Sequence, residues 1–257
     1  MDERLSAFGR LLDIMDELRE KCPWDKNQTM ESLRNLTLEE AYELADAITT
    51  NDPDEIKKEL GDILLHIVFY ARIGSEMKSF DIKDVIDAIN EKLVYRHPHV
   101  FSDTKVADEN EVKENWEHLK IKESKKTVLS GVPVSLPALI KANRIQDKVK
   151  GVGFDWEKKH QIWDKVMEEL QELRDEINKA DKKKIESEFG DLFFSLVNAA
   201  RLYGIDPETA LEKTNRKFTR RFNYLESRTM AIGKSLKSMS LDEMNVIWEE
   251  AKGFDDA

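Results

Sequence analysis

Apolar residues recur at every third or fourth position along much of this chain, which is the spacing of amphipathic helices. The pattern is clear in Ala41, Leu44 and Ile48, and again from Leu60 to Ala71. We therefore predict an all-α fold. The expected helices cover residues 3–20, 30–49, 53–77, 82–95 and 109–124 in the first half, and 138–149, 159–179, 182–203, 207–231 and 241–252 in the second.

Capping residues mark several of the expected helix starts. Asp52-Pro53 and Asp206-Pro207 each place an N-cap before a proline in the first helical position. Asp81 is the expected cap of the fourth helix, and Ser240-x-x-Glu243 has the sequence of a capping box. Between the first two helices, residues 22–25 are predicted to form an ordered loop.

An acidic pattern is written twice in the chain. Four acids of the first half each reappear 129 positions later. The pairs are Glu40 with Glu169, Glu43 with Glu172, Glu59 with Glu188, and Asp62 with Asp191. Trp116 corresponds to Trp248 at an offset of 132, so the repeat continues beyond the acids in each copy. The repetition predicts two tandem copies of one helical-bundle domain.

Within each copy the acids are placed symmetrically about a turn, at Asn51 in the first and Ala180 in the second. An antiparallel helix hairpin that turns at Asn51 brings Glu43 beside Glu59, and the outer pair of acids together in the same way. Each acidic pair falls on the edge of an apolar stripe. We therefore expect four carboxylates to converge beside the core of each hairpin.

Length and composition agree with two helical domains. A chain of 257 residues is long enough for two, and 40% hydrophobic with 36% charged residues suits a folded helical protein. We predict domains at 1–120 and 137–257, joined by a linker at 121–136 that contains Gly131 and Pro133.

Charge and cysteine usage limit the partners and the compartment. A net charge of -11 argues against binding to nucleic-acid polymers. Cys22 is the single cysteine, so an internal disulfide is impossible and a reducing cytosol is expected. We recognise no signal, transit or membrane-spanning segment, so we expect a cytoplasmic protein with no membrane partner.

Converging carboxylates without histidine or cysteine are hard oxygen ligands, which suit Mg²⁺, with Mn²⁺ as the alternative ion. A single E-x-x-E is commonest on solvated helix faces, but the duplication and the hairpin symmetry favour metal binding here. A di-iron bundle is disfavoured, because it needs Glu-x-x-His on two helices.

A basic stripe and an aromatic residue accompany the second acidic set. Asn215, Lys217, Arg220 and Arg221 lie at neighbouring helical positions where they can face phosphate oxygens, although such a stripe also occurs on solvated faces. Lys184 is a further phosphate ligand or a surface charge. Trp248 stacks on a nucleoside or packs in the core.

These residues together resemble the MazG-type nucleoside triphosphate pyrophosphohydrolases, whose mark is E-x-x-E followed by E-x-x-D on adjacent helices. The resemblance covers nearly the whole chain. Further matching segments are CPWD at 22–25, RHPHVF at 96–101, GVP-x-x-LPAL at 131–139, VGFDW at 152–156 and NRKFTRRF at 215–222.

The resemblance implies an all-α fold whose bundles are completed by a homodimer, and Mg²⁺-dependent hydrolysis of ribo- and deoxynucleoside triphosphates to monophosphate and pyrophosphate. It implies that Glu169, Glu172, Glu188 and Asp191 hold the metal. Glu168 would orient or deprotonate the attacking water. The substrate would be bound by Lys165, Lys184, Asn215, Lys217, Arg220, Arg221 and Trp248.

The two copies are not equivalent as phosphate binders, since Asn215 and Arg221 correspond to Val94 and Val100 in the first copy. We therefore expect most of the turnover in the second copy. Two other interpretations stay open: a helical scaffold with a vestigial metal site formed by these acids, and a pyrophosphatase restricted to a few nucleotides.

Overall fold

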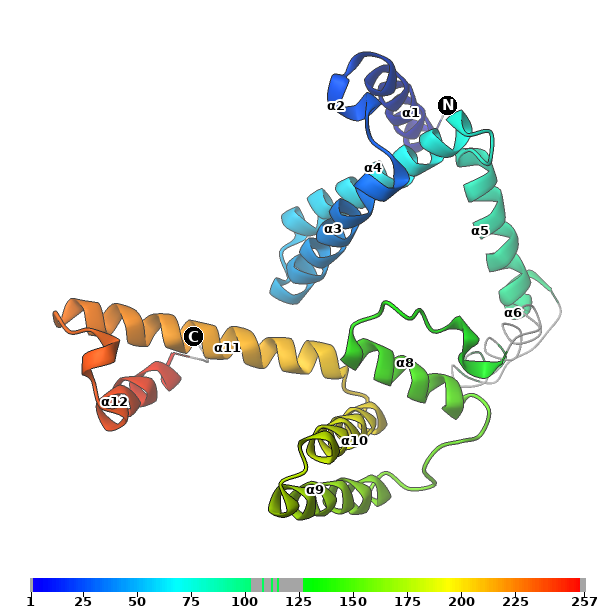
Figure 1. Cartoon of the computed structure of the whole chain (residues 1–257). Helices are drawn as coiled ribbons and strands as arrows, with labels where there is room; N and C mark the ends of the chain where they lie inside the picture. Colours follow the sequence, from blue (N-terminus) through cyan, green and yellow to red (C-terminus); the bar gives the residue numbers. More distant parts are fainter. Residues whose placement is uncertain (1, 103–107, 109–111, 113–114, 116–126, 255–257) are drawn as a thin grey trace. The chain divides into compact units, whose positions relative to one another are not determined.

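The computed structural model describes residues 2–102, 108, 112, 115 and 127–254, and in these residues the chain forms helices and no strand (Figure 1). The all-α prediction is confirmed. No described helix is long and apolar enough to cross a membrane. The chain divides into an N-terminal unit, Met1–Asp108, and a C-terminal unit, Glu109–Ala257, and each is described by itself.

The helices follow one another along the chain in a simple order. The N-terminal unit contains α1 (Glu3–Lys21), α2 (Pro23–Lys26), α3 (Met30–Thr50), α4 (Pro53–Glu76), α5 (Ile82–Arg96) and α6 (Pro98–Phe101). The C-terminal unit contains η1 (Val128–Gly131), α8 (Ala138–Lys150), α9 (Gln161–Lys179), α10 (Lys182–Leu202), α11 (Pro207–Ala231), η2 (Leu236–Ser238) and α12 (Leu241–Lys252).

Most predicted helices are found within two residues of their expected ends, and the differences are short elements. The expected loop at 22–25 is mostly the helix α2, because Pro23 in the first helical position fixes a helical φ. Pro98 starts α6 in the same way. The helix predicted at 109–124, with Trp116, lies almost wholly outside the described residues. The predicted domain boundaries stay a prediction.

The predicted caps are present. Asp52 accepts hydrogen bonds from the backbone amides of Asp54 and Glu55, and Asp81 forms a capping box at the start of α5. Ser240 and Glu243 cap each other at the start of α12. These bonds satisfy amides that a helix start leaves without partners.

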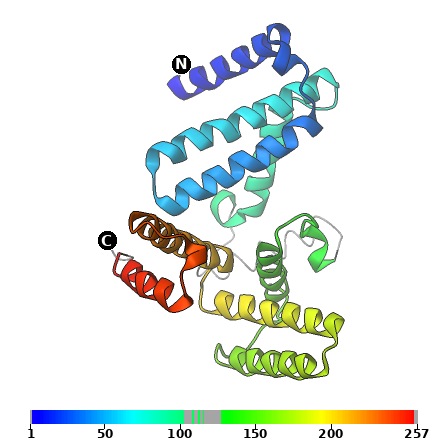
Figure 2. The same ribbon diagram turned by 60° about the vertical axis from the view of Figure 1, so that its left-hand side comes forward.

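Each unit is built around an antiparallel hairpin, α3–α4 in the first and α9–α10 in the second, and in Figure 2 the two helices of each hairpin lie next to each other. The chain reverses at Asn51 and at Ala180, which both adopt the left-handed helical conformation, with φ of 56° and 58°. The two predicted turn positions are therefore confirmed.

The hairpins are anchored by small cores and by two arginines. Met15, Leu33, Val68 and Phe69 form the N-terminal core. The C-terminal unit buries Ile162, Val166 and Leu173 of α9, Val197 and Ala199 of α10, and Leu225 of α11.

The two arginines explain two of the sequence motifs. Arg19 ties the CPWD turn to the end of α4 through the carbonyl of Asp25 and the carboxylate of Glu76. Arg201 ties the VGFDW segment to α10 by an ion pair with Asp155. Each motif therefore fixes the entry of the chain into the following hairpin.

Large apolar side chains remain exposed along both hairpins. Phe189 and Phe193 on α10 are 42% and 56% exposed, and Leu60 and Leu64 on α4 are 52% and 39% exposed. These residues repeat at helical spacing, so each hairpin has an apolar face that its own unit leaves uncovered.

The left-handed turns give a stability prediction. The Cβ atom of alanine makes the left-handed helical conformation unfavourable, whereas glycine has no Cβ atom and adopts it freely. We expect Ala180→Gly to raise the free energy of unfolding by about 0.5–1 kcal/mol. The same change at Ala45, an exposed interior position of α3, is expected to lower it by about 0.5–1 kcal/mol. Chemical denaturation measures both, and equal signs for the two variants would contradict the argument.

Candidate active site and metal centres

The predicted carboxylates of the N-terminal unit converge between α3 and α4. One carboxylate oxygen each of Glu40, Glu43 and Glu59 lies within 4.8 Å of the others. Glu59 is 2% exposed, and its Oε2 atom has no hydrogen-bond partner. A buried carboxylate oxygen without a donor is costly, so this atom favours a cation at the cluster.

The second hairpin repeats the arrangement. One carboxylate oxygen each of Glu169, Glu172 and Glu188 lies within 4.8 Å of the others. Glu169 is buried and Glu172 is exposed, so the cluster is open to solvent at Glu172. Three of the four predicted carboxylates therefore meet in each copy.

The fourth acid of each set lies close enough to act through its charge. The charge of Asp62 raises the pKa of Glu40, and the charge of Asp191 raises the pKa of Glu188. The described groups of converging oxygens do not include either aspartate.

The carboxylates within each cluster repel one another in the absence of a cation. Burial, followed by the charges of Asp62, Glu43 and Glu59, raises the pKa of Glu40 above its ordinary value, and a hydrogen bond to Glu59 acts in the same direction. In the second copy, burial and then the charge of Glu172 raise the pKa of Glu188. Both shifts disfavour the ionised form, as expected for carboxylates that share one site.

Each cluster carries one lysine, but from a different helix. Lys58 of α4 donates to Glu59 at 2.8 Å, whereas Lys165 of α9 lies 2.8 Å from both Glu168 and Glu169. Ion pairing raises the pKa of both lysines. Sequence reasoning selected Lys165 and missed Lys58, because a Lys-Glu dipeptide on a helix carries no spacing signal.

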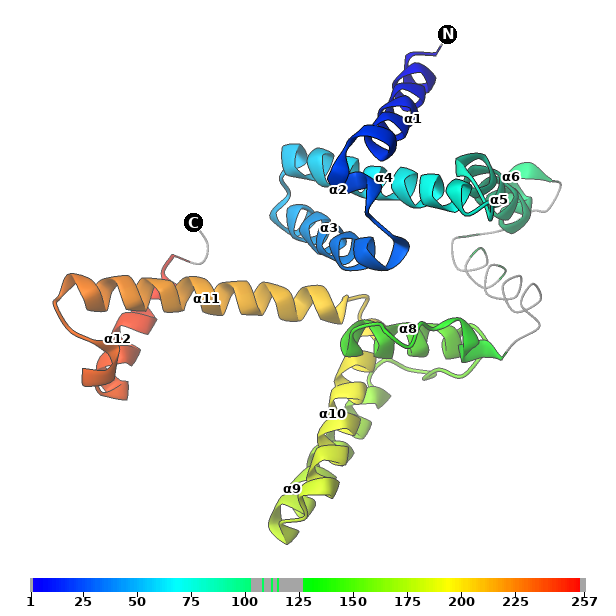
Figure 3. The same cartoon turned by 45° about the horizontal axis from the view of Figure 1, so that its top comes forward.

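The basic stripe and Trp248 form a separate group between α11 and α12. The centre of the Trp248 ring lies 5.1 Å from the centre of the Phe218 ring and 5.7 Å from the Arg221 guanidinium carbon. Trp248 is therefore half-buried against aromatic and cationic neighbours. Figures 1 and 3 show α12 beside the C-terminal half of α11, away from the α9–α10 hairpin.

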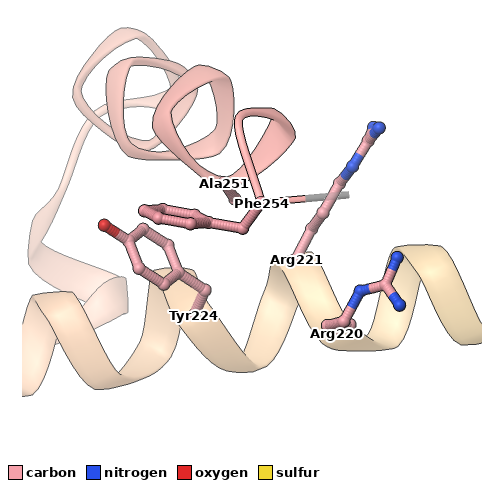
Figure 4. Close-up of a pocket in the computed structure, with 5 residues that line it drawn as sticks. All are labelled: Arg220, Arg221, Tyr224, Ala251 and Phe254. Carbon is pink, nitrogen blue, oxygen red and sulfur yellow. The ribbon is translucent and has the colours of Figure 1, made fainter. Parts of the chain in front are cut away.

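A cavity of about 210 Å³ adjoins this group, lined by Arg220, Arg221, Tyr224, Ala251 and Phe254. Figure 4 shows the two guanidinium groups on one side and the Tyr224 and Phe254 rings, which are tilted by 45° to each other, on the other. Asn215 donates to Glu212, and Lys184 and Lys217 are exposed. Within one chain, the described structure brings Lys165 to the carboxylates and leaves the α11 residues apart from them.

Comparison with known proteins assigns the chain to a family. The MazG nucleotide pyrophosphohydrolase domain matches it twice, at residues 28–101 and 157–225. The chain belongs to the MazG family. Both matches contain one complete hairpin with its carboxylate cluster, so the duplicated site coincides with the duplicated MazG domain.

Full-length relatives agree with this assignment. The nucleoside triphosphate pyrophosphohydrolase of Escherichia coli (strain K12) is 42% identical, with 96% of this chain and 98% of the relative covered. The nucleoside triphosphate pyrophosphohydrolase/pyrophosphatase MazG of Thermotoga maritima is 41% identical over all of both chains. The uncharacterized protein YabN of Bacillus subtilis is 48% identical over 95% of this chain and 51% of its own length.

These findings confirm that the chain is an enzyme of the MazG pyrophosphohydrolase class. The residues at the two clusters also fit a divalent metal ion. Each cluster offers three converging oxygens, and the first includes the buried Oε2 of Glu59 without a donor. Which ion is bound, and what each residue does, stay predictions.

Removing one charge from a cluster is expected to stabilise the metal-free protein. The raised pKa of Glu40 means that its ionised form costs folding free energy above that pKa, and that the cost disappears as the pH falls and the group is protonated. Glu40→Gln removes the charge and offers an amide donor in place of the ionised carboxylate. We expect a higher Tm in chelator at pH 8, by about 1–2 °C, and a smaller gain at pH 4.

Scanning calorimetry with and without Mg²⁺ tests this expectation. Glu20→Gln, which removes an exposed carboxylate of α1 outside the cluster, is the control and should leave the Tm unchanged. Added Mg²⁺ should stabilise the wild type more than the Glu40→Gln variant. A lower Tm for Glu40→Gln in chelator at pH 8 would contradict the proposed repulsion.

Proposed function

We propose that this chain hydrolyses nucleoside triphosphates, both ribo and deoxy, at the α-phosphorus to a nucleoside monophosphate and pyrophosphate, with Mg²⁺ as its cofactor. The observation that carries the proposal is the convergence of three carboxylate oxygens within 4.8 Å in each MazG domain. Full-length relatives named as nucleoside triphosphate pyrophosphohydrolases support the same reaction. We expect a housekeeping role in the nucleotide pool of the cytoplasm.

The metal would be held by Glu169, Glu172, Glu188 and Asp191. When bound, Mg²⁺ neutralises the triphosphate and lowers the pKa of a coordinated water. Glu168 would orient this water and accept its proton. Its carboxylate is exposed, and it already bonds to Lys165 at 2.8 Å.

Phosphate binding is proposed for four cations of the C-terminal unit. Lys165 lies at the carboxylates, and its ammonium would move from Glu169 to a phosphate oxygen once the acids are neutralised. Lys184, Lys217 and Arg221 would hold the remaining oxygens and the pyrophosphate leaving group. Trp248, with Asn215 and Arg220 nearby on α11, would contact the nucleoside.

The C-terminal unit is the proposed main site of turnover. Counting back 129 positions, Lys165 corresponds to Leu36 and Lys184 to Glu55 in the N-terminal copy. Beyond the hairpin the repeat has an offset of 121, at which Val100 stands at the position of Arg221. The first copy therefore has the carboxylates but few of the cations that would neutralise a triphosphate.

A homodimer would complete the site. The α11–α12 group lies apart from the hairpin of its own chain (Figure 3), and the hairpin has an uncovered apolar face. Packing of this face against a second copy would bury the phenylalanines of α10 and bring another α11 to the carboxylates.

Product analysis with Mg²⁺ and a nucleoside triphosphate in ¹⁸O-labelled water tests the reaction. We expect pyrophosphate without label and monophosphate with label, because water attacks the α-phosphorus. Glu172→Gln should lower kcat by about 100-fold or more, since it removes a metal ligand. Glu43→Gln, its counterpart in the first copy, should retain most of the activity.

Three outcomes would redirect the assignment. Loss of activity in Glu43→Gln but not in Glu172→Gln would move the turnover to the N-terminal unit. Diphosphate and phosphate as products would exclude the proposed reaction. No turnover of any common nucleotide, together with no Mg²⁺-dependent rise in Tm, would favour the scaffold interpretation.

The dimer is tested on the apolar face of α10. Phe193→Glu places a charge on this face and is expected to convert the dimer to a monomer, measured by light scattering during size-exclusion chromatography. Lys182→Glu also adds negative charge to α10, but outside the apolar face, and should leave the mass unchanged. A monomeric wild type, or a Phe193→Glu variant that remains dimeric, would refute this interface.

A further inference from the structure

A cavity between α11 and the end of α12 contains two aromatic side chains to which the proposed function gives no role. It measures about 210 Å³ and is lined by Arg220, Arg221, Tyr224, Ala251 and Phe254. In Figure 4 the two rings lie on one side of it and the two arginine side chains on the other. At the offset of 121, the arginines correspond to His99 and Val100. The paired guanidinium groups are therefore specific to the second copy.

The two rings present flat apolar surface at the cavity. The centres of the Tyr224 and Phe254 rings lie 5.3 Å apart, and their planes are tilted by 45°, so the rings are not stacked in parallel. Phe254 is 56% exposed, next to the buried Ala251. Accessible aromatic side chains are surfaces on which nucleobases stack, because every base has a π-face. The rings therefore suit a flat aromatic ligand, whereas a phosphate group alone would leave them unused.

The hydrogen-bonding groups at the cavity are mainly donors. A guanidinium carries five N–H donors and no acceptor. The Tyr224 hydroxyl donates to Glu250 Oε2 at 3.4 Å, and Figure 4 shows this hydroxyl at the end of the ring that points away from both arginines. A base that presents two acceptors to a guanidinium is therefore favoured. Guanine does so with O6 and N7, whereas adenine presents N7 beside an amino group that itself donates.

The cavity lies one helical turn beyond the proposed phosphate ligands. Lys217, Arg221 and Tyr224 are separated by four and then three residues, so they share one face of α11. At a rise of about 1.5 Å per residue, this row covers about 10 Å of the helix. Trp248 packs on Arg221, in the middle of the row. A nucleotide that lies along the row would have its phosphates at Lys217 and Arg221 and its base at Tyr224.

We propose that this cavity receives the base of the nucleotide, with Phe254 and Tyr224 as its stacking partners and Arg220 as the donor to O6 and N7 of guanine. Arg221 packs on Trp248 and is assigned to phosphate, so Arg220 is assigned to the base. The inference rests on the proposed function, because the ligand is the substrate of the same site. The rings accept any base, whereas the guanidinium selects among them. The enzyme would therefore use several nucleotides and prefer GTP to ATP.

Steady-state kinetics of pyrophosphate release from GTP and ATP test the role of the rings. Phe254→Ala in the full-length chain should raise KM for both nucleotides by about 10–100-fold and leave kcat within about 3-fold of the wild type, because stacking acts on the bound and the reacting nucleotide alike. Phe254→Trp, which keeps an aromatic face, should restore most of the affinity. Val246→Ala is the control, since it truncates an exposed apolar side chain of α12 outside the cavity, and KM should stay unchanged.

Arg220→Met tests the selection of the base. Methionine keeps an unbranched apolar side chain and has no N–H group. We expect kcat/KM for GTP to fall by about 10-fold or more and kcat/KM for ATP by less than about 3-fold, since the bidentate bond to O6 and N7 is available to guanine alone. An equal loss for both nucleotides would indicate that the charge acts on the phosphates, and it would overturn the assignment of Arg220 to the base.

Binding without turnover separates this inference from the proposed function. Calorimetry with Mg²⁺ compares GMP with ribose 5-phosphate, which has the same sugar and phosphate but no base. The wild type should bind GMP at least about 10-fold more tightly, and Phe254→Ala should remove most of this difference. The comparison stays valid if no pyrophosphate is released, in which case the proposed reaction fails and the base site does not.

Three results would overturn the base site in a protein that releases pyrophosphate. The first is a KM for GTP that Phe254→Ala leaves unchanged. The second is equal affinity of the wild type for GMP and ribose 5-phosphate. The third is a higher kcat/KM of the wild type for ATP than for GTP, because the donors of Arg220 would then not select the base.

Discussion

Repulsion among the carboxylates of each hairpin is the constraint on which the rest of the structure depends. Three acids point at one another where two helices pack, and burial raises the cost of their charge. The helices must therefore be held together by other means. Capped helix starts, left-handed turns and the two arginine anchors, Arg19 and Arg201, hold the hairpins in the register that makes the acids meet. A bound cation would offset this repulsion.

The two copies offset the negative charge of their carboxylates with different side chains. The N-terminal cluster has Lys58 from α4, and its hairpin also contains a polar network of Thr37, His66 and Tyr70. The C-terminal cluster has Lys165 from α9, and Val166, Ser195 and Ala199 occupy the positions of that network. The first copy thus pairs Glu59 with a lysine of α4, and the second pairs Glu169 with a lysine of α9, which we propose would turn to a phosphate oxygen of the substrate.

The exposed apolar faces of the hairpins are also connected with the carboxylate sites. A hairpin that buried both faces inside its own unit would have no room for a substrate beside the acids. Phe189, Phe193, Leu60 and Leu64 instead stay exposed in the single chain. The free energy gained by covering them in a dimer would offset part of the cost of assembling like charges.

The sequence by itself determined the long helices, the turns at Asn51 and Ala180, and the convergence of Glu40, Glu43 and Glu59 and of their counterparts. Helical periodicity can be read within a single segment, and the repeat can be read by comparing two segments of the chain. Only the tertiary structure decided that Lys58 reaches the first cluster, that Trp248 packs against Phe218 and Arg221, and that His66 bonds to Thr37 across the hairpin. Those contacts join different helices or depend on rotamers, so no spacing along the chain encodes them.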